Sequence, residues 1–412
     1  MKILHVCLDF PPRRTRYGSG TVNDDVLRAL YVAGNEVTVL TPGRAERQLT
    51  ATPGIRVIEV PRPLSEQFLL PRDRPTEMFS SPANVHRWNT AAITWLNHED
   101  PWSGWTPDVI FNDGWTTQGV AEHLSSRFSC PVVSTAHVVD RHYTSVGGRT
   151  PRPTDSEFRT AEEQFFRSSD RIVVPSSTAR ELAAHYFPQH EPKLHVVEHG
   201  LDWTSLERIP NDRGKQRRAQ DATVTVVYLG RISSERGWRP FVEAFRDAQA
   251  LDSRLRLRII GDGTRLEEAR TQFRHPAVTF CGAMPRHQVW HELLAADVYA
   301  NPALIETFGV AELEAMGAGL AVVSHLGFGK HTHIDHLVSG IQIPIAARDG
   351  HMELDHAAWV QWLTELSANG QMRQRLGRCA QTAARQRFPV ERMAAGLLSV
   401  FADAIQQAPH RR

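Results

Sequence analysis

The feature that most constrains the fold is a repeated alternation of short apolar runs with longer stretches of helical periodicity. The first cycle contains KILHVCL (2–8), the helical stretch TVNDDVLRALYVAG (21–34) and the apolar run EVTVLTP (36–42). Such a cycle is typical of a strand–helix–strand unit in a parallel sheet. Similar apolar runs follow at IRVIEVP (55–61), DVIFND (108–113), CPVVSTAH (130–137) and RIVVPSS (171–177).

A polar stretch, IPNDRGKQRRAQDA (209–222), interrupts the alternation, which then begins again. We therefore predict an N-terminal Rossmann-like domain over 1–205, a linker over 206–222 and a second Rossmann-like domain over 223–388. A chain of 412 residues is comfortable for two domains. The apolar runs of the second domain are TVVYLGR (225–231), LRLRIIGDG (255–263), AVTFCGA (277–283), DVYANPA (297–303) and AVVSHL (321–326).

Charge, cysteine content and hydropathy exclude several classes of protein. The formal net charge of +1 selects no nucleic acid or other polyanion as a partner. The four cysteines lie far apart in the sequence, which argues against a zinc knuckle or a disulfide framework and suits a reducing cytosol. No apolar run approaches the roughly 20 residues of a membrane span, and the first ten residues do not resemble a signal peptide. We therefore expect a cytoplasmic protein without an integral membrane segment.

The segment IETFGVAELEAMGAG (305–319) combines two carboxylates with a predicted helix start. From Gly309 onward the pattern is helical, so the first backbone N–H groups would be free to bind an anion. Glu306 lies in the loop before this helix, and Glu314 lies within it. Their carboxylates can accept hydrogen bonds from sugar hydroxyls on either side of a bound phosphate.

Two further segments are predicted to face the same place. In LGRISSERGWRPF, Arg231 follows a strand and Arg236 precedes a helix, so two guanidinium groups could bind a diphosphate. In IIGDG, Gly261 and Gly263 indicate a tight turn from strand to helix.

These segments resemble the signature of the retaining GT-B glycosyltransferases of the sucrose-synthase and mannosyltransferase-like group, glycosyltransferase family 4. The resemblance is strongest over 224–324 and is also present at 1–42 and 130–202. It implies an α/β GT-B fold, in which two Rossmann-like parallel-sheet domains face a deep interdomain cleft. It also implies that a C-terminal helix over 389–412 crosses back to the N-terminal domain.

The resemblance assigns roles to individual residues of the second domain. Glu306 would contact the hydroxyls of the donor sugar, Glu314 the nucleotide ribose, and Arg231 the diphosphate. Arg236 stands where the family usually has lysine. The turn that reaches sugar and phosphate would be Thr307, Phe308, Gly309 and Val310, and Met284 lies in the segment that usually meets the base.

In the first domain, Gly18 and Gly20 are similar to the glycine loop of the family and are assigned to the donor. A simple strand-to-helix turn remains an alternative. A dehydrogenase fingerprint is incomplete, because Val22 and Asn23 follow where a glycine is needed. The neighbouring Arg16 would bind an acidic group of the acceptor, unless it belongs to a solvated loop.

Residues after two other predicted strands, together with His199, complete the set. His137 looks like the histidine that faces the donor sugar, although a structural histidine is the alternative. Asp113 and Trp115, in a loop similar to the H-D-W segment of starch synthases, are possible acceptor contacts. Packing of Trp115 in the core is an equally good interpretation of this residue. His199 replaces the asparagine of the family's N-G-x-D segment.

The histidine-rich segment 325–336 departs from the family pattern, because no glutamate matches the G-G-x-x-E motif there. We expect a polar loop near the sugar pocket. A metal site is an alternative, but no cysteine or clear carboxylate beyond Asp335 completes a tetrahedral set. The candidate metal ligands would be His325, His331, His333 and His336.

The sequence therefore predicts transfer of a sugar, with retention, from a UDP- or GDP-linked donor to a soluble hydroxyl- or amine-bearing acceptor. Acceptors of this kind include small metabolites, oligosaccharides and natural products. We expect no cofactor and no metal, because fixed cations can stabilise the leaving diphosphate. An epimerase or phosphorylase on the same fold and a non-catalytic sugar-nucleotide binder remain alternatives. The predicted catalytic residues are His137, Arg231, Arg236 and Glu306.

Overall fold

The computed structural model describes most of the chain and divides it into two compact units. The first unit combines residues up to Gly200 with those from Val390 onward, and the second extends from Leu201 to Pro389. The described residues are 1–8, 10, 18–43, 48–52, 54–61, 82–139, 141–142, 155–209, 223–233, 236–326, 333–348 and 351–408.

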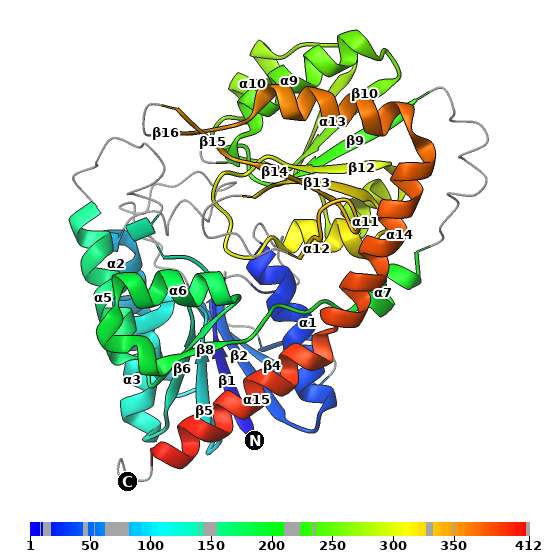
Figure 1. Ribbon diagram of the computed structural model, residues 1–412. Coiled ribbons are helices and arrows are strands. Elements are labelled where there is room, and N and C mark those ends of the chain that lie inside the picture. The colour runs from blue at the N-terminus through cyan, green and yellow to red at the C-terminus, as the bar shows by residue number, and fades with distance from the viewer. Residues whose placement is uncertain are drawn as a thin grey trace. The chain divides into compact units, whose positions relative to one another are not determined.

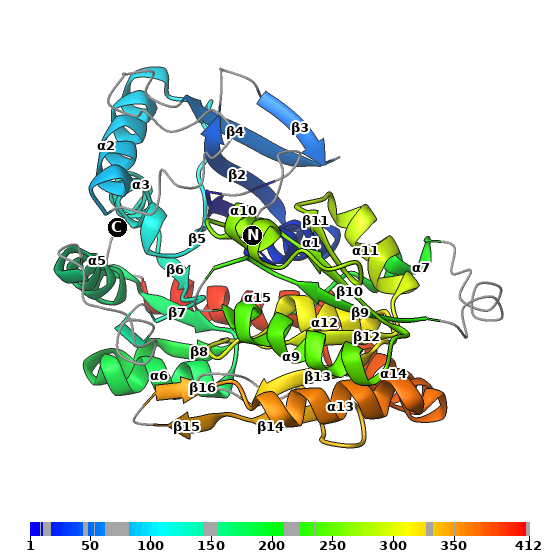
Figure 2. The ribbon, with the colours of Figure 1, turned by 90° about the horizontal axis from the view of Figure 1, so that it is seen from above.

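Among the described residues, the first unit contains an eight-stranded sheet of order β3-β4-β2-β1-β5-β6-β7-β8. Neighbouring strands are parallel, except that β3 runs antiparallel to β4 at the edge of the sheet (Figure 2). The strands are β1 (Lys2–Val6), β2 (Glu36–Gly43), β3 (Gln48–Thr52), β4 (Ile55–Pro61), β5 (Val109–Asn112), β6 (Val132–Thr135), β7 (Arg171–Val174) and β8 (Leu194–Val196).

Helices of the first unit follow the strands as the alternation predicts. Strands β5 and β6 are buried along their whole length, which explains why their sequences are continuous apolar runs rather than alternating ones. The helices are α1 (Gly18–Val32), α2 (Pro82–Glu99), α3 (Gln118–Phe128), α5 (Asp155–Ser168), α6 (Ser177–Tyr186) and α15 (Val390–Gln407), with 3₁₀ turns η3 (Trp115–Thr117) and η4 (Pro188–Lys193).

The last helix, α15, packs on the first unit although it follows the second unit in the sequence (Figure 1). It contacts α1, β5, β6 and β7, and it buries Leu397 and Phe401 completely. The ring of Phe401 lies 5.3 Å from that of Phe111 on β5, measured between centroids. The partly buried Arg171 also donates a hydrogen bond to Asp403 at 2.6 Å.

Among the described residues, the second unit has a six-stranded sheet of order β11-β10-β9-β12-β13-β14, in which every neighbouring pair is parallel. A short antiparallel hairpin, formed by β15 (Ala346–Arg348) and β16 (His351–Glu353), lies outside this sheet. The six strands are β9 (Val224–Leu229), β10 (Leu255–Ile260), β11 (Val278–Gly282), β12 (Val298–Asn301), β13 (Ala321–Leu326) and β14 (Ile341–Pro344).

The core of the second unit lies between its sheet and two helices that pack on each other, α9 and α13. Phe241 on α9 and Trp359 on α13 meet edge to face, with centroids 4.9 Å apart. The helices are α7 (Trp203–Glu207), α9 (Trp238–Leu251), α10 (Leu266–Gln272), α11 (Arg286–Ala295), α12 (Val310–Gly317), α13 (His356–Ala368) and α14 (Gly370–Arg387).

The predicted α/β fold with two parallel-sheet domains is confirmed, and each predicted apolar run contributes a strand. The units divide at Gly200, slightly before the predicted end of the N-terminal domain, because α7 packs with the second unit. Residues 210–222 of the predicted linker lie outside the described residues. Over the described part of the chain, no helix combines the length and hydropathy needed to cross a bilayer.

Candidate active site

Helix α12 begins where the sequence places it, and its first turn is held by a buried aromatic cluster. Gly309 caps the helix with a φ of 92°, a left-handed conformation that glycine adopts without steric cost. The ring of Phe308 is buried and lies 4.5 Å from His333 and 5.8 Å from Phe388. The backbone N–H groups that follow Gly309 have no acceptor within the helix, so this end can bind an anion.

Glu306, directly before this turn, is paired with Arg236. The Arg236 Nη1 donates to Glu306 Oε2 at 2.5 Å, while the backbone N–H of Thr307 donates to Oε1 at 3.2 Å. Only 20% of the Arg236 side chain and 16% of the Glu306 side chain are exposed, so the pair is largely shielded from water. The structure therefore brings together two residues that the sequence assigned to adjacent parts of one ligand.

Glu314, within α12, has an arginine neighbour that sequence reasoning missed. Arg286 Nε lies 3.6 Å from Glu314 Oε1, and its guanidinium lies 4.9 Å from the centroid of the Trp290 ring. Arg286 begins α11, two positions after the half-buried Met284. The only signal in the sequence is this proximity to the segment assigned to the nucleotide base.

Two loops at the carboxyl ends of β9 and β10 pack tightly on each other. Gly261 has a φ of 140°, and a Cβ built there would lie 1.9 Å from the carbonyl oxygen of Gly230. The N–H of Ile232 donates to Asp262 O at 3.0 Å. These contacts fix the backbone around Arg231, whose carbonyl accepts a hydrogen bond from Tyr228 and whose side chain is exposed.

A buried carboxylate, Glu312, joins α12 to the sheet and was also missed by the sequence analysis. Its Oε2 accepts a hydrogen bond from Asn301 Nδ2 at 2.9 Å and another from the hydroxyl of Ser324. Asn301 ends β12 and Ser324 lies on β13, so one side chain ties the helix to two neighbouring strands. This network supports the position of the α12 N-terminus.

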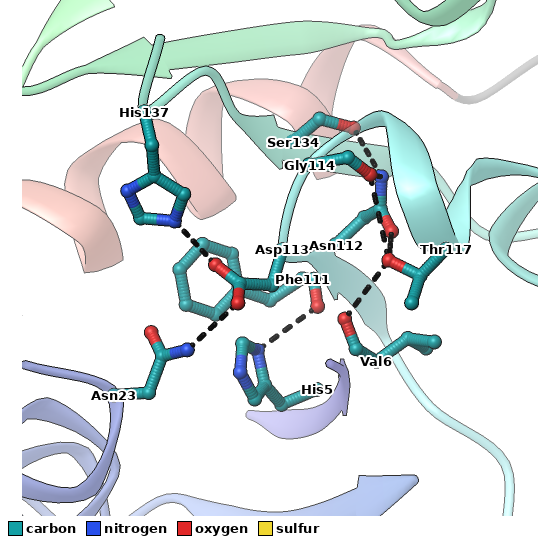
Figure 3. Close-up of polar contacts among 10 residues, drawn as sticks. All are labelled: His5, Val6, Asn23, Phe111, Asn112, Asp113, Gly114, Thr117, Ser134 and His137. Atoms are coloured by element: carbon teal, nitrogen blue, oxygen red, sulfur yellow. Dashed lines mark hydrogen bonds and ion pairs between the residues drawn. The ribbon is translucent and has the colours of Figure 1, made fainter. Parts of the chain in front are cut away.

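In the first unit, His137 and Asp113 form a close pair at the carboxyl ends of β6 and β5 (Figure 3). His137 Nε2 lies 2.5 Å from Asp113 Oδ1, and Asn23 Nδ2 donates to Asp113 Oδ2 at 2.9 Å. Two buried histidines, His5 and His199, lie around the pair. An acceptor contact of Asp113 remains a prediction, and such a contact would compete with these two bonds.

The other first-unit residues of the predicted site have different surroundings. Gly18 and Gly20 lie in the first turn of α1 rather than in a loop before it, because the helix begins three positions earlier than its apolar pattern indicates. Trp115 is half-buried, and its ring meets that of Phe158 edge to face at 5.6 Å. Trp115 packs against the core of the first unit, and its acceptor contact remains a prediction. Arg16 lies outside the described residues.

Burial lowers the pKa of His5 to about 4 and the pKa of His199 to about 3, from an ordinary value of 6.5. The unfolded chain therefore binds protons below about pH 6.5 that the folded chain does not. We expect the free energy of unfolding to be constant near neutral pH and to fall as the pH drops from about 6.5 toward 4, by on the order of 3 kcal/mol for each histidine. Denaturant unfolding at a series of pH values measures this. A decline in His199→Asn as steep as in the wild type would contradict the assignment.

The structure describes His325, His333 and His336 of the segment 325–336, and His333 packs on the rings of Phe308 and Phe388. The indole N–H of Trp359 donates to His325 Nε2 at 2.8 Å, so His325 Nδ1 carries the proton that it shares with the Pro302 carbonyl. The backbone N–H of Gln342 donates to His336 Nδ1 at 3.0 Å. His331 lies outside the described residues. Both nitrogens of His325 are therefore engaged within the protein, and this removes it from the alternative metal site.

Two family profiles match the chain. "Glycosyltransferase Family 4" matches residues 17–204, and "Glycosyl transferases group 1" matches residues 210–381. A D-inositol 3-phosphate glycosyltransferase of Xylanimonas cellulosilytica is 27% identical over 98% of this chain and 96% of its own length.

Solved structures share the fold over the whole chain. Sucrose-phosphate synthase of Thermosynechococcus elongatus matches 98% of this chain and 99% of its own, with a TM-score of 0.77 at 17% identity. The Anabaena protein Alr3699/HepE, in complex with UDP-glucose, matches 99% of each chain with a TM-score of 0.66 at 18% identity. The present chain, with its two parallel-sheet units, thus has the GT-B fold.

Proposed function

Because this chain belongs to glycosyltransferase family 4 and is a glycosyltransferase of the GT-B fold, we propose that it transfers a sugar with retention from a nucleotide diphosphate sugar to a soluble acceptor. The observation that carries the proposal is the arrangement around α12. A free helix N-terminus lies between two glutamates, each of which has an arginine beside it.

We assign donor binding to the second unit. The diphosphate would bind at the N-terminus of α12 and at the guanidinium groups of Arg231 and Arg236. Glu306 would accept hydrogen bonds from the sugar, and Glu314 from the ribose. In this account Arg236 has two roles, since it orients Glu306 through their 2.5 Å contact and contributes positive charge next to the phosphates.

The chemical step then depends mainly on electrostatic stabilisation. The bond between the anomeric carbon and the phosphate oxygen breaks, and the acceptor oxygen bonds to the same face of the sugar. The leaving diphosphate takes the acceptor proton. Fixed cations and backbone N–H groups stabilise the developing charge without reorganising during the reaction.

We assign acceptor binding to the first unit, where His137 is the side chain proposed to act at the reacting sugar. A quarter of the His137 side chain is exposed, against 8% of Asp113, so the imidazole is the more accessible member of the pair. The curated relative named for D-inositol 3-phosphate makes a phosphorylated polyol one acceptor to test.

A panel assay tests the proposal. UDP- and GDP-sugars are incubated with candidate acceptors, including D-inositol 3-phosphate, and products are identified by mass spectrometry and NMR. We expect one pair to give a glycoside with the anomeric configuration of the donor. Inversion would refute retention. Conversion of the donor without an acceptor would indicate an epimerase, and binding without turnover would indicate a sugar-nucleotide binder.

Removing divalent cations is expected to leave transfer intact. The proposed site supplies its positive charge from Arg231, Arg236 and the α12 N-terminus, so no metal is needed to hold the diphosphate. Initial rates are measured before and after treatment with EDTA, and again after adding Mg²⁺ or Mn²⁺. Loss of activity that a divalent ion restores would show that this part of the proposal is wrong.

A further inference from the structure

The buried carboxylate of Asp113 has a separate partner for each of its oxygens. One oxygen faces His137 Nε2 at 2.5 Å, and the other accepts from Asn23 Nδ2 at 2.9 Å (Figure 3). The backbone N–H of Asp113 donates to Val6 O at 2.9 Å, which fixes the residue against the end of β1. Asp113 is therefore held at the carboxyl end of β5 by three hydrogen-bonding partners.

Asp113 remains an anion at neutral pH. Burial alone would raise the pKa of this carboxyl group, but the charge and hydrogen bond of His137, helped by His5 and by the Asn23 hydrogen bond, lower it to about 2. An ionised carboxylate can only accept hydrogen bonds. The Nε2 of His137 must therefore carry a proton and donate it toward Asp113.

From this geometry we propose that Asp113 is a positioning residue. It fixes the orientation of the His137 ring and keeps the ring proton on Nε2, while His137 itself meets the substrate. This inference rests on the proposed function, because it gives His137 a task in sugar transfer. It also changes the assignment of Asp113 from a contact of the acceptor to a support of the catalytic histidine.

Asn23 gives the proposal a sharp test, because its amide N–H requires an oxygen opposite it. In Asp113→Asn, the single side-chain oxygen is expected to stay with Asn23, so the new NH₂ group faces His137. Nε2 must then accept a hydrogen bond, and the neutral ring moves its proton to Nδ1. Removing Asn23 as well leaves the new amide free to turn its oxygen back toward His137.

The experiment records side-chain ¹⁵N NMR spectra of the histidines at alkaline pH, with the His137 signal assigned from its loss in His137→Gln. We expect the Nε2–H form in the wild type, the Nδ1–H form in Asp113→Asn, and a return of the Nε2–H form in Asp113→Asn/Asn23→Ala. In the transfer assay, Asp113→Asn is expected to lower kcat by about 10²-fold with little change in KM, and the double variant to recover part of the loss.

Asn112→Ala is the matched control. Asn112 is the buried neighbour of Asp113 in the sequence, but its side chain bonds Gly114, Thr117 and Ser134 instead (Figure 3). It also donates a hydrogen bond to Gln118 Oε1 at 2.7 Å. We expect this variant to lose stability while keeping the His137 signal of the wild type.

An unchanged tautomer or an unchanged kcat in Asp113→Asn would overturn the inference. If the wild type transferred no sugar, the proposed function would fail instead, and the NMR signals would still decide whether Asp113 sets the tautomer.

Discussion

Replacing Arg231 with alanine is expected to lower kcat for sugar transfer by about 10²-fold or more. The side chain follows β9 and is exposed, next to a backbone fixed by the contact between Gly230 and Gly261. Its guanidinium would stabilise charge that develops on the leaving diphosphate only as the glycosidic bond breaks. The loss should therefore be larger in kcat than in KM. Steady-state kinetics with saturating acceptor measures both constants.

Arg239→Ala is the matched control for this variant. Arg239 lies on the neighbouring helix α9 and forms its hydrogen bonds with Glu268 and Gln272 at the surface. Surface ion pairs of this kind contribute at most about 1 kcal/mol, so its loss should leave kcat close to the wild-type value. Equal kinetics for the two alanine variants would remove Arg231 from the site.

Replacing Phe401 with alanine is expected to destabilise the first unit by about 3–5 kcal/mol. Phe401 is fully buried on α15, and its ring packs 5.3 Å from that of Phe111. Truncation would leave a cavity under β5, the strand that ends at Asn112, directly before Asp113. The Phe111 carbonyl also accepts a hydrogen bond from His5 at 3.1 Å, so the same cavity would loosen the histidine cluster.

Denaturant unfolding followed by a probe in the first unit measures this effect, because two units can unfold in separate transitions. Gln406→Ala serves as control, since Gln406 is exposed on the same helix and its truncation should change stability by less than about 0.5 kcal/mol. Similar unfolding midpoints for the two variants would mean that α15 does not belong to the core of the first unit.

The fold was predictable because the central parallel strands, such as β5 and β6, are buried along their whole length and appear in the sequence as apolar runs. Strand β3 (QLTAT) was missed, since it is short, largely polar and lies at the edge of the sheet. The start of α1 was placed too late, because Gly18-Ser19-Gly20 has no apolar periodicity and reads as a loop. Periodicity detects the faces that helices and strands bury, and it does not detect polar or glycine-rich ends.

The residues of the candidate site could be predicted only where they lie close together in one segment of the sequence. Glu306, Gly309 and Glu314 lie within a single loop and helix, so their relation follows from helical geometry. The contact of Asn23 with Asp113 joins residues 90 positions apart, and no local pattern pairs them. Arg286 was missed for the same reason, because it approaches Glu314 only once α11 and α12 have packed.

The most direct test of the account is a crystal structure of the enzyme with a bound nucleotide diphosphate sugar. The account predicts that the diphosphate lies at the N–H groups following Gly309 and within hydrogen-bond distance of Arg231 and Arg236. The carboxylate of Glu306 should contact the sugar, and that of Glu314 the ribose. A donor bound elsewhere, or one whose phosphates contact neither arginine, would contradict the central claim.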